Sequence, residues 1–352
     1  MITHSKTSLS TDDITNVLTT LLSGDISDNK ERKNFEKAMA KYVGNAYSVA
    51  TSSGTLALQL ALRLMKIDGG GGDEILVPTF VCDDILSAVH QVGAKAIPVD
   101  IDTTTFNINP EDAVSRITKK TKAIILVHMF GLPNEMEKFQ NFPVPIIEDC
   151  AHSLGATWNK KFVGTFGHIS TFSFHGLKLL TCGEGGMLMT NSQEIIQNHK
   201  EMLKPNFMIG GYKLEYHLSD ILAKLGLSQL QSFPSVLKLR QEMALRYTKT
   251  LTNLSQTFLP IIKTKNQISS CFRYVLRHKT LQFSTLEKMF INRNIIIRRP
   301  VKNLLHRLLG LKDSNYPVAS EYFEHIFSIP FYPSLTKLEE KTVLHETKTI
   351  LS

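Results

Sequence analysis

The sequence predicts an α/β protein in which a large domain built on a mainly parallel sheet precedes a smaller α+β domain. Length is the first reason, because 352 residues, 42% of them hydrophobic, suffice for two globular units. The second reason is that short apolar runs alternate with helix-like segments from Tyr47 onward. The third is that these runs are rich in Ile, Leu and Val with little alternation, as expected for strands covered on both faces.

The elements of the large domain follow in chain order. Residues 12–43 have helical patterning, and Asp12 and Asp13 stand where a helix N-terminus favours negative charge. The glycine run at 69–72 predicts a loop tip, because a strand follows it where a phosphate-binding loop needs a helix. Six strands are predicted, at residues 74–78, 94–100, 122–129, 145–150, 169–174 and 186–190.

The smaller domain is predicted to begin within a long helix. Helical patterning runs over residues 219–247, and strand-like segments follow at 272–277 and 294–297. We therefore expect a large domain at residues 1–235, which includes an N-terminal helical arm, and a small α+β domain at residues 236–352.

Composition excludes several classes of protein. The formal charge of +8 suits an anionic partner, but Lys and Arg are scattered, without the basic patch and interleaved aromatics of a nucleic-acid interface. A phosphorylated small molecule and a merely basic surface both remain open. The four cysteines form no C-x-x-C pair, so we expect neither a metal nor a disulfide framework. No signal peptide or membrane span is predicted, and we expect a cytoplasmic protein with no membrane partner.

The first motif with chemical meaning is Thr51-Ser52-Ser53-Gly54-Thr55, which precedes a strongly helical run. Small hydroxyl residues and a glycine at a helix start expose backbone N–H groups toward an anion, so the segment could form a phosphate cup. An ordinary helix cap explains the same residues.

The second motif is the acidic end of a predicted strand, Ile146-Ile147-Glu148-Asp149. Ligands of parallel α/β sheets bind at the carboxyl ends of strands, so Asp149 would be delivered to a site. A carboxylate there can keep a pyridinium nitrogen protonated. A cap on the following segment is the alternative interpretation.

The third motif places Lys178 between apolar residues and the glycine-rich turn Gly183-Glu184-Gly185-Gly186. A partly desolvated lysine has a lowered pKa, and its neutral amine can attack an aldehyde. A surface lysine is the usual alternative, but the apolar surroundings weigh against it.

In this order the motifs resemble the DegT/DnrJ/EryC1/StrS family of sugar aminotransferases, over nearly the whole chain. The most diagnostic match is Ser173-Phe174 with Lys178 and the Gly183-Glu184-Gly185-Gly186 turn, similar to the family pattern S-F-x-x-x-K-x-x-x-x-G-E-G-G. Further matches are Ser52-Ser53-Gly54-Thr55, Pro78-Thr79-Phe80-Val81, residues 122–131, residues 148–153 and residues 328–336.

The resemblance implies fold type I, the architecture of the aspartate aminotransferases, with pyridoxal 5′-phosphate (PLP) as cofactor. It makes Lys178 the lysine that carries the cofactor as a Schiff base, and Asp149 the partner of the pyridinium nitrogen. Pro78-Thr79-Phe80-Val81 is similar to the family's P-x-x-T-F segment, shortened between Pro and Thr, so Phe80 inherits the aromatic role of stacking on the ring. The other residues implied at the cofactor are His152 beside the ring hydroxyl, and Ser53, Gly54, Thr55 and Ser173 at the phosphate.

Four positions or segments depart from the family pattern. Leu179 follows the lysine where Asn is common. Glu215 and His217 stand where the family has N-x-R, and that Asn reaches the phosphate of the neighbouring subunit's cofactor. A carboxylate beside a phosphate is repulsive, so either Glu215 points elsewhere or the phosphate cup is built differently. Residues 298–306 stay basic but lack the family's Y-P-P-L-H sequence, which helps to bind the sugar nucleotide, so a plain basic loop also fits.

The resemblance implies an enzyme that moves an amino group from an amino acid, glutamate in the first place, to a nucleoside-diphosphate-linked keto-deoxyhexose. Pyridoxamine phosphate (PMP) would be the intermediate, and the product would serve amino sugar and polysaccharide biosynthesis. A homodimer with shared active sites is implied as well. One alternative is a cofactor-dependent sugar dehydratase, although such relatives have His in place of Lys178. The other is a catalytically altered member that acts as a binding or regulatory protein, which Glu215 and His217 would fit.

Overall fold

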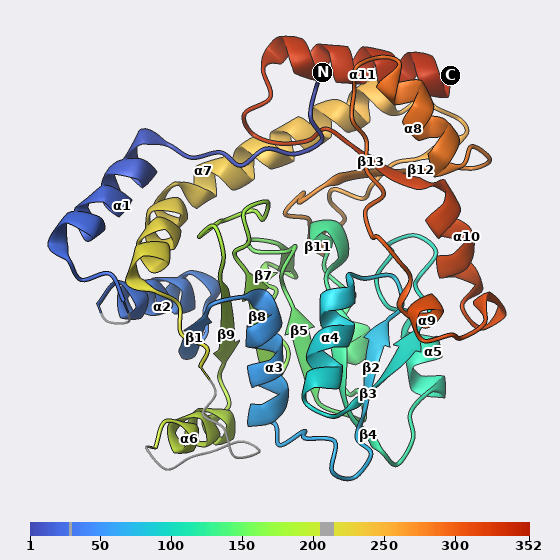
Figure 1. The fold of residues 1–352 in the computed structure, drawn as a ribbon. Coiled ribbons are helices and arrows are strands. Elements are labelled where there is room, and N and C mark those ends of the chain that lie inside the picture. Colours follow the sequence, from blue (N-terminus) through green and yellow to red (C-terminus); the bar gives the residue numbers. More distant parts are fainter. Residues whose placement is uncertain (28–29, 205–214) are drawn as a thin grey trace.

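The computed structural model describes residues 1–27, 30–204 and 215–352 (Figure 1). Its centre is a seven-stranded sheet with the strand order β1-β9-β8-β5-β4-β2-β3. The strands are β1 (Tyr47–Thr51), β2 (Glu74–Pro78), β3 (Lys95–Val99), β4 (Thr121–Val127), β5 (Ile146–Asp149), β8 (Ile169–Ser173) and β9 (Gly186–Thr190).

The sheet is mainly parallel, as the sequence predicts. Strands β3, β2, β4, β5 and β8 pair in parallel, and β9 runs antiparallel to both of its neighbours, β8 and β1. All six predicted strands are present within three residues of their expected ends, whereas β1 was not predicted as a strand. The strands are continuous apolar runs because both faces of the sheet are covered. In β9, for example, every residue is buried.

Helices cover the two faces of this sheet. Figure 1 shows α3 (Gly54–Leu64) and α4 (Asp83–Gln91) side by side in front of the strands, and α3 contacts β8 and β9. Along β9, Leu188 packs into the apolar cluster on that side, while Met187 and Met189 pack into the cluster on the other side. The shorter helices α5 (Pro110–Ser115) and α6 (Gln193–Met202) follow β3 and β9.

The N-terminal region predicted as helical contains two helices, α1 (Thr11–Ser23) and α2 (Lys30–Val43). The first ends because Gly24 adopts a left-handed conformation with φ of 77°, which glycine tolerates at a helix C-cap. Both helices pack against α7 (Asp220–Leu251).

The expected domain boundary at residues 235–236 falls inside α7, next to Pro234. Before this proline, Leu230 and Phe233 pack into the cluster around α2, and after it Met243 and Tyr247 pack into a separate cluster. The division at residues 235 and 236 stays a prediction, and α7 joins both clusters as one continuous helix.

The C-terminal part contains a three-stranded antiparallel sheet with the order β10-β12-β13. The predicted strand at 272–277 is present as β12. The prediction of a strand at 294–297 is wrong: this segment makes only an isolated bridge, between Ile295 and Ile2. The backbone of residues 294–296 forms hydrogen bonds with Ile2 at the start of the chain, and β12 pairs with β13 instead. The elements here are β10 (Thr257–Phe258), β12 (Tyr274–His278), β13 (Ile326–Ile329), α8 (Phe283–Ile291), α9 (Leu305–Leu308), α10 (Pro317–His325) and α11 (Lys337–Leu351).

The remaining elements are short. A small sheet joins β11 (Gln267–Ile268) to β6 (Thr157–Trp158) and β7 (Lys161–Phe162). It connects the C-terminal part to the segment between β5 and β8 of the large sheet. Three 3-10 turns are η1 (Met129–Gly131), η2 (Met136–Phe139) and η3 (Asp313–Asn315). Within the described ranges, no helix has both the length and the apolar character required to cross a membrane.

Candidate active site

A cavity of about 360 Å³ lies at the carboxyl ends of β5 and β8, beside the N-terminus of α3. Ligands of open α/β sheets bind at this edge. Seven of the eight residues predicted for the site line the cavity, although they come from three separate stretches of the chain. They are Ser53, Gly54, Thr55, Asp149, His152, Ser173 and Lys178.

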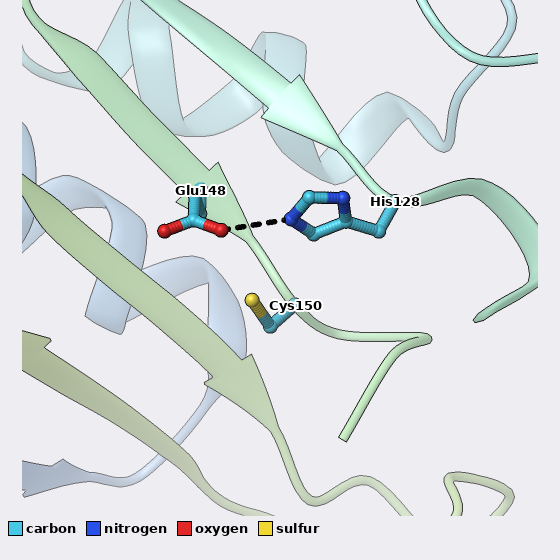
Figure 2. Close-up of side chains that lie close together, drawn as sticks. All are labelled: His128, Glu148 and Cys150. Atoms are coloured by element: carbon cyan, nitrogen blue, oxygen red, sulfur yellow. Dashed lines mark hydrogen bonds and ion pairs between the residues drawn. The ribbon is translucent and has the colours of Figure 1, made fainter. Parts of the chain in front are cut away.

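The end of β5 carries two carboxylates, Glu148 and Asp149, which point to opposite faces because successive strand residues alternate. Glu148 is fully buried. One of its oxygens accepts hydrogen bonds from the backbone N–H groups of Phe166 at 2.7 Å and Gly167 at 2.6 Å. The other accepts from Gly164 N at 2.8 Å and from His128 Nε2 at 3.0 Å, as Figure 2 shows for the histidine. Each oxygen of this buried carboxylate therefore has two donors.

His128, Glu148 and Cys150 lie close enough together to suggest a metal site (Figure 2). The backbone N–H of Asn134 donates to His128 Nδ1 at 3.0 Å, so the proton must sit on Nε2, where it is donated to Glu148. Burial alone would raise the pKa of Glu148, but the hydrogen bonds from His128 and from the N–H groups of Gly167 and Gly164 outweigh it and lower this pKa. The cluster is thus a hydrogen-bonded support for the ends of β4 and β5, and sequence reasoning did not find it.

Asp149 faces the cavity. Its Oδ1 accepts a hydrogen bond from the backbone N–H of Ala151 at 2.9 Å. Burial raises the pKa of Asp149, while that hydrogen bond and the neighbouring charge of Lys178 oppose the increase. Asp149 is therefore a carboxyl group disposed to share a proton with a partner in the cavity.

Lys178 follows a turn in which its backbone N–H donates to the His175 carbonyl at 2.9 Å. Its Nζ lies 5.3 Å from the centre of the Phe272 ring. Burial lowers the pKa of Lys178, and the neighbouring Cys82 and Asp149 only partly offset this effect. The lowered pKa agrees with the apolar, glycine-bounded setting in the sequence.

The start of α3 approaches the ends of β8 and β9 closely. Ser53 caps the helix, since its Oγ accepts from Leu56 N at 3.1 Å. A Cβ atom on Gly54 would lie 2.8 Å from the Cβ of Ser173, and one on Gly186 would lie 2.3 Å from the Ser53 carbonyl oxygen. The helix cap is therefore present, and Ser53, Gly54 and Thr55 also line the cavity at a helix N-terminus, the kind of position that favours an anion.

His152 lies between two aromatic rings, at a centroid distance of 4.3 Å from Phe272 and 6.4 Å from Phe130, nearly parallel to both. Burial, together with the charges of Lys178 and Arg273, lowers the pKa of His152 well below its ordinary value, so the ring is neutral. Its Nδ1 atom is buried and has no hydrogen-bond partner within the described ranges. A ligand that offers a polar group to this ring would remove that deficit.

The prediction for Phe80 is wrong in position. Phe80 is fully buried and packs against Phe106, Phe130 and Phe323, away from the cavity lining. If the P-x-x-T-F segment is counted from Pro78 without shortening, its aromatic position falls on Cys82, and Cys82 does line the cavity. The Cys82 side chain is exposed in the cavity, and desolvation by the surrounding protein raises the pKa of its thiol to about 12, so a small neutral group occupies this place.

Further residues of the cavity carry no sequence signal. Arg273 lines it from the start of β12, and Phe272 touches it through His152 and Lys178. An isolated bridge joins Thr51 to His217, so residues 215–217 pass beside the helix start, where Glu215 and His217 are exposed. Leu179 is buried in the apolar cluster around α2.

Comparison with known proteins places this geometry in a family. The sequence profile described as the DegT/DnrJ/EryC1/StrS aminotransferase family matches residues 7–348. The chain is 31% identical over 316 residues to GDP-perosamine synthase of Escherichia coli O157:H7, an alignment that covers 86% of this chain and 85% of that protein.

Solved structures agree with this result. Spr1654 of Streptococcus pneumoniae, provisionally described as a sugar aminotransferase, has structures in PLP and PMP forms. The PLP form matches with a TM-score of 0.90 at 26% identity, covering 99% of this chain and 97% of that one. Helicobacter pylori PseC, an aminotransferase involved in pseudoaminic acid biosynthesis, matches with a TM-score of 0.91 and 99% coverage of both chains. At 23% identity, PseC supports the fold alone, which is fold type I.

The support beneath the site can be tested with Glu148→Gln. Removing the charge from a buried, fully bonded carboxylate should lower the free energy of unfolding by about 3–5 kcal/mol at pH 7. Because the folded-state pKa of Glu148 lies below its ordinary value of 4.5, wild type keeps this advantage above that pH and loses it as the pH falls through the folded-state pKa. Chemical denaturation between pH 7 and pH 3, with Glu135→Gln at the exposed Glu135–Lys138 pair as control, measures the difference. A difference independent of pH would contradict the account.

The close approach at α3 can be tested with Gly186→Ala. The new Cβ would collide with the Ser53 backbone, so we expect a loss of about 1–3 kcal/mol in the free energy of unfolding. Gly176→Ala is the matched control, because nothing lies within 3.7 Å of its added Cβ and its change should stay within about 0.5 kcal/mol. Equal stability of the two variants would show that α3 and β9 are not in this close contact.

Proposed function

Because the chain belongs to the DegT/DnrJ/EryC1/StrS aminotransferase family, we propose that it moves an amino group from glutamate to a nucleoside-diphosphate-linked keto-deoxyhexose. The family and the relatives make the chain a PLP-dependent sugar aminotransferase. The amino donor, the nucleotide-linked acceptor and the roles of individual residues are the proposal. The observation that carries it is that a lysine of lowered pKa and a buried aspartate line one cavity with a helix N-terminus.

The cavity suits PLP at each of its parts. Ser53, Gly54, Thr55 and Ser173 would hold the phosphate, because backbone N–H groups at the start of α3 and its dipole favour an anion. The unpartnered Nδ1 of neutral His152 would hydrogen-bond the ring hydroxyl. Cys82 would stand at the ring in place of the family's aromatic residue.

When bound, PLP supplies an aldehyde that joins to amines, a ring that withdraws electrons from the adjoining carbon, and a carrier for the amino group as PMP. Lys178 Nζ would hold the cofactor and then act on the donor. Since burial lowers its pKa, Nζ can accept the proton of the donor's α-carbon and release it again as a general acid. Asp149 would pair as a carboxylate with the protonated ring nitrogen, and that positive charge would offset the burial that raises the pKa of Asp149.

A basic outer cavity of about 680 Å³ next to the site supports a phosphorylated acceptor. Arg298 and Lys302 line it together with Arg299, which is already paired with Glu324 at 3.7 Å. We propose that Arg298 and Lys302 contact the acceptor's phosphates. We also propose a cytoplasmic homodimer with shared active sites, which serves amino sugar and polysaccharide biosynthesis.

The half-reaction tests the donor. Glutamate should convert the visible absorption of the PLP-loaded protein to that of the PMP form, and a keto-sugar nucleotide should restore it. Lys178→Ala should bind the cofactor but lose conversion by at least about 100-fold, because the proton-transfer group is absent. Wild type that binds PLP yet converts with no amino donor would favour a binding or regulatory role instead.

The role of Asp149 is tested with Asp149→Asn. The amide cannot hold the ring nitrogen protonated, so conversion by glutamate should slow by about 100-fold or more while PLP remains bound. Stopped-flow absorbance measures the rate, and Asp102→Asn, whose carboxylate bonds only within its own turn, provides the control. An unchanged rate would remove Asp149 from the proposed mechanism.

A further inference from the structure

Arg273 lines four cavities, three of which are the cofactor cavity and two of its neighbours. It lines the cofactor cavity, the basic outer cavity, and a third cavity of about 300 Å³ bounded by the N-terminal segment from His4 to Ser10. Within the described part of the chain, Arg273 is the one residue that lines all three. Its side chain therefore borders the cofactor cavity and both of these neighbouring cavities.

Two contacts hold Arg273 in place. Its Nη1 donates to the Pro300 carbonyl at 3.1 Å, and its Cζ lies 5.3 Å from the centre of the Phe272 ring. Lys178 Nζ lies at the same distance from that ring, and His152 stacks on it. The Lys178 amine and the Arg273 guanidinium group thus face the same aromatic ring, and both side chains line the cofactor cavity.

Arg273 lacks a carboxylate partner among the residues that the structure describes. Asp84 and Glu184 line the same cavity, but neither forms an ion pair with it. Its charge lowers the pKa of both Lys178 and His152, so it acts electrostatically on the site without being neutralised there. A partly buried cation without a counter-ion is costly, and an anionic ligand would remove that cost.

We infer that Arg273 binds the α-carboxylate of the amino donor, an inference that rests on the proposed function. The donor's amine must react beside Lys178, and its α-carboxylate is attached to the same carbon as that amine. A guanidinium group in the same cavity as Lys178 can take both carboxylate oxygens in a bidentate pair and so fix the α-carbon for proton transfer. Arg298 and Lys302 line only the outer cavity and lie on the side where acceptor phosphates would enter.

The test compares two amino donors in the half-reaction, with wild type and Arg273→Gln. Glutamate carries the α-carboxylate, and 4-aminobutyrate is the same amine without it. We expect Arg273→Gln to raise the apparent Kd for glutamate about 10- to 100-fold, the range of a charge-assisted pair. The slow conversion by 4-aminobutyrate should stay within about twofold of wild type, since this amine makes no contact with Arg273.

Two controls separate binding from structure. Arg273→Lys keeps the charge but loses the bidentate fork, so its Kd for glutamate should fall between wild type and Arg273→Gln. Arg293→Gln, at an exposed pair with Glu346 in the same part of the molecule, should leave both donors unchanged. Calorimetric binding of succinate to the PLP-loaded protein provides a readout without turnover, and Arg273→Gln should lose it.

The outcomes are distinguishable. If Arg273→Gln weakened the half-reaction equally with glutamate and 4-aminobutyrate, Arg273 would only support the fold. An unchanged Kd for glutamate, with weaker binding of a nucleoside diphosphate, would assign Arg273 to the acceptor. Either result overturns the inference while the aminotransferase function stands. If wild type converts with no amino donor, the proposed function fails. Independently of turnover, succinate binding that Arg273→Gln leaves unchanged would overturn the inference about Arg273.

Discussion

The alternation of side chains at the end of β5 is the constraint on which the site depends. Glu148 and Asp149 are neighbours in sequence, but one points into the protein and the other into the cavity. Glu148 is ionised because four hydrogen bonds compensate its burial, and they tie β5 to β4 and to the loop at residues 164–167. Asp149 has few such partners, so burial raises its pKa. The same strand end thus provides a rigid anchor and a proton-sharing carboxyl group.

Charge within the cavity follows a consistent pattern. Desolvation keeps the exposed Cys82 thiol and the His152 ring neutral and lowers the pKa of Lys178, while Arg273 remains a cation without a carboxylate partner in the described ranges. The N-terminus of α3 adds a further region that favours anions. The site therefore favours negatively charged ligand groups at two places, Arg273 and the N-terminus of α3. A phosphorylated cofactor and a carboxylated donor together meet this requirement.

The sequence predicted the parts of the fold and site that depend on local pattern. Buried strands are continuous apolar runs, so β2, β3, β4, β5, β8 and β9 were predicted. Asp149 was singled out as the acidic end of such a run, and Lys178 by its apolar, glycine-bounded setting. Contacts between distant segments were not predictable. Ile2 occupies the hydrogen bonds of residues 294–296, which removes the strand expected there, and Phe272 and Arg273 reach the cavity only through tertiary packing. Phe80 does not line the cavity; counted from Pro78 without the assumed shortening, the motif's aromatic position moves by two residues to Cys82, which does line it.

The proposed roles of Asp149 and Arg273 both require that Lys178 carries the cofactor. Reduction of the PLP-loaded protein with borohydride fixes the cofactor on whichever amine holds it, and mass spectrometry of the digested protein then locates the pyridoxyl group. The account predicts a single modified peptide, with the group on Lys178. A pyridoxyl group on another lysine, or a loaded protein that yields no reduced adduct, would contradict it.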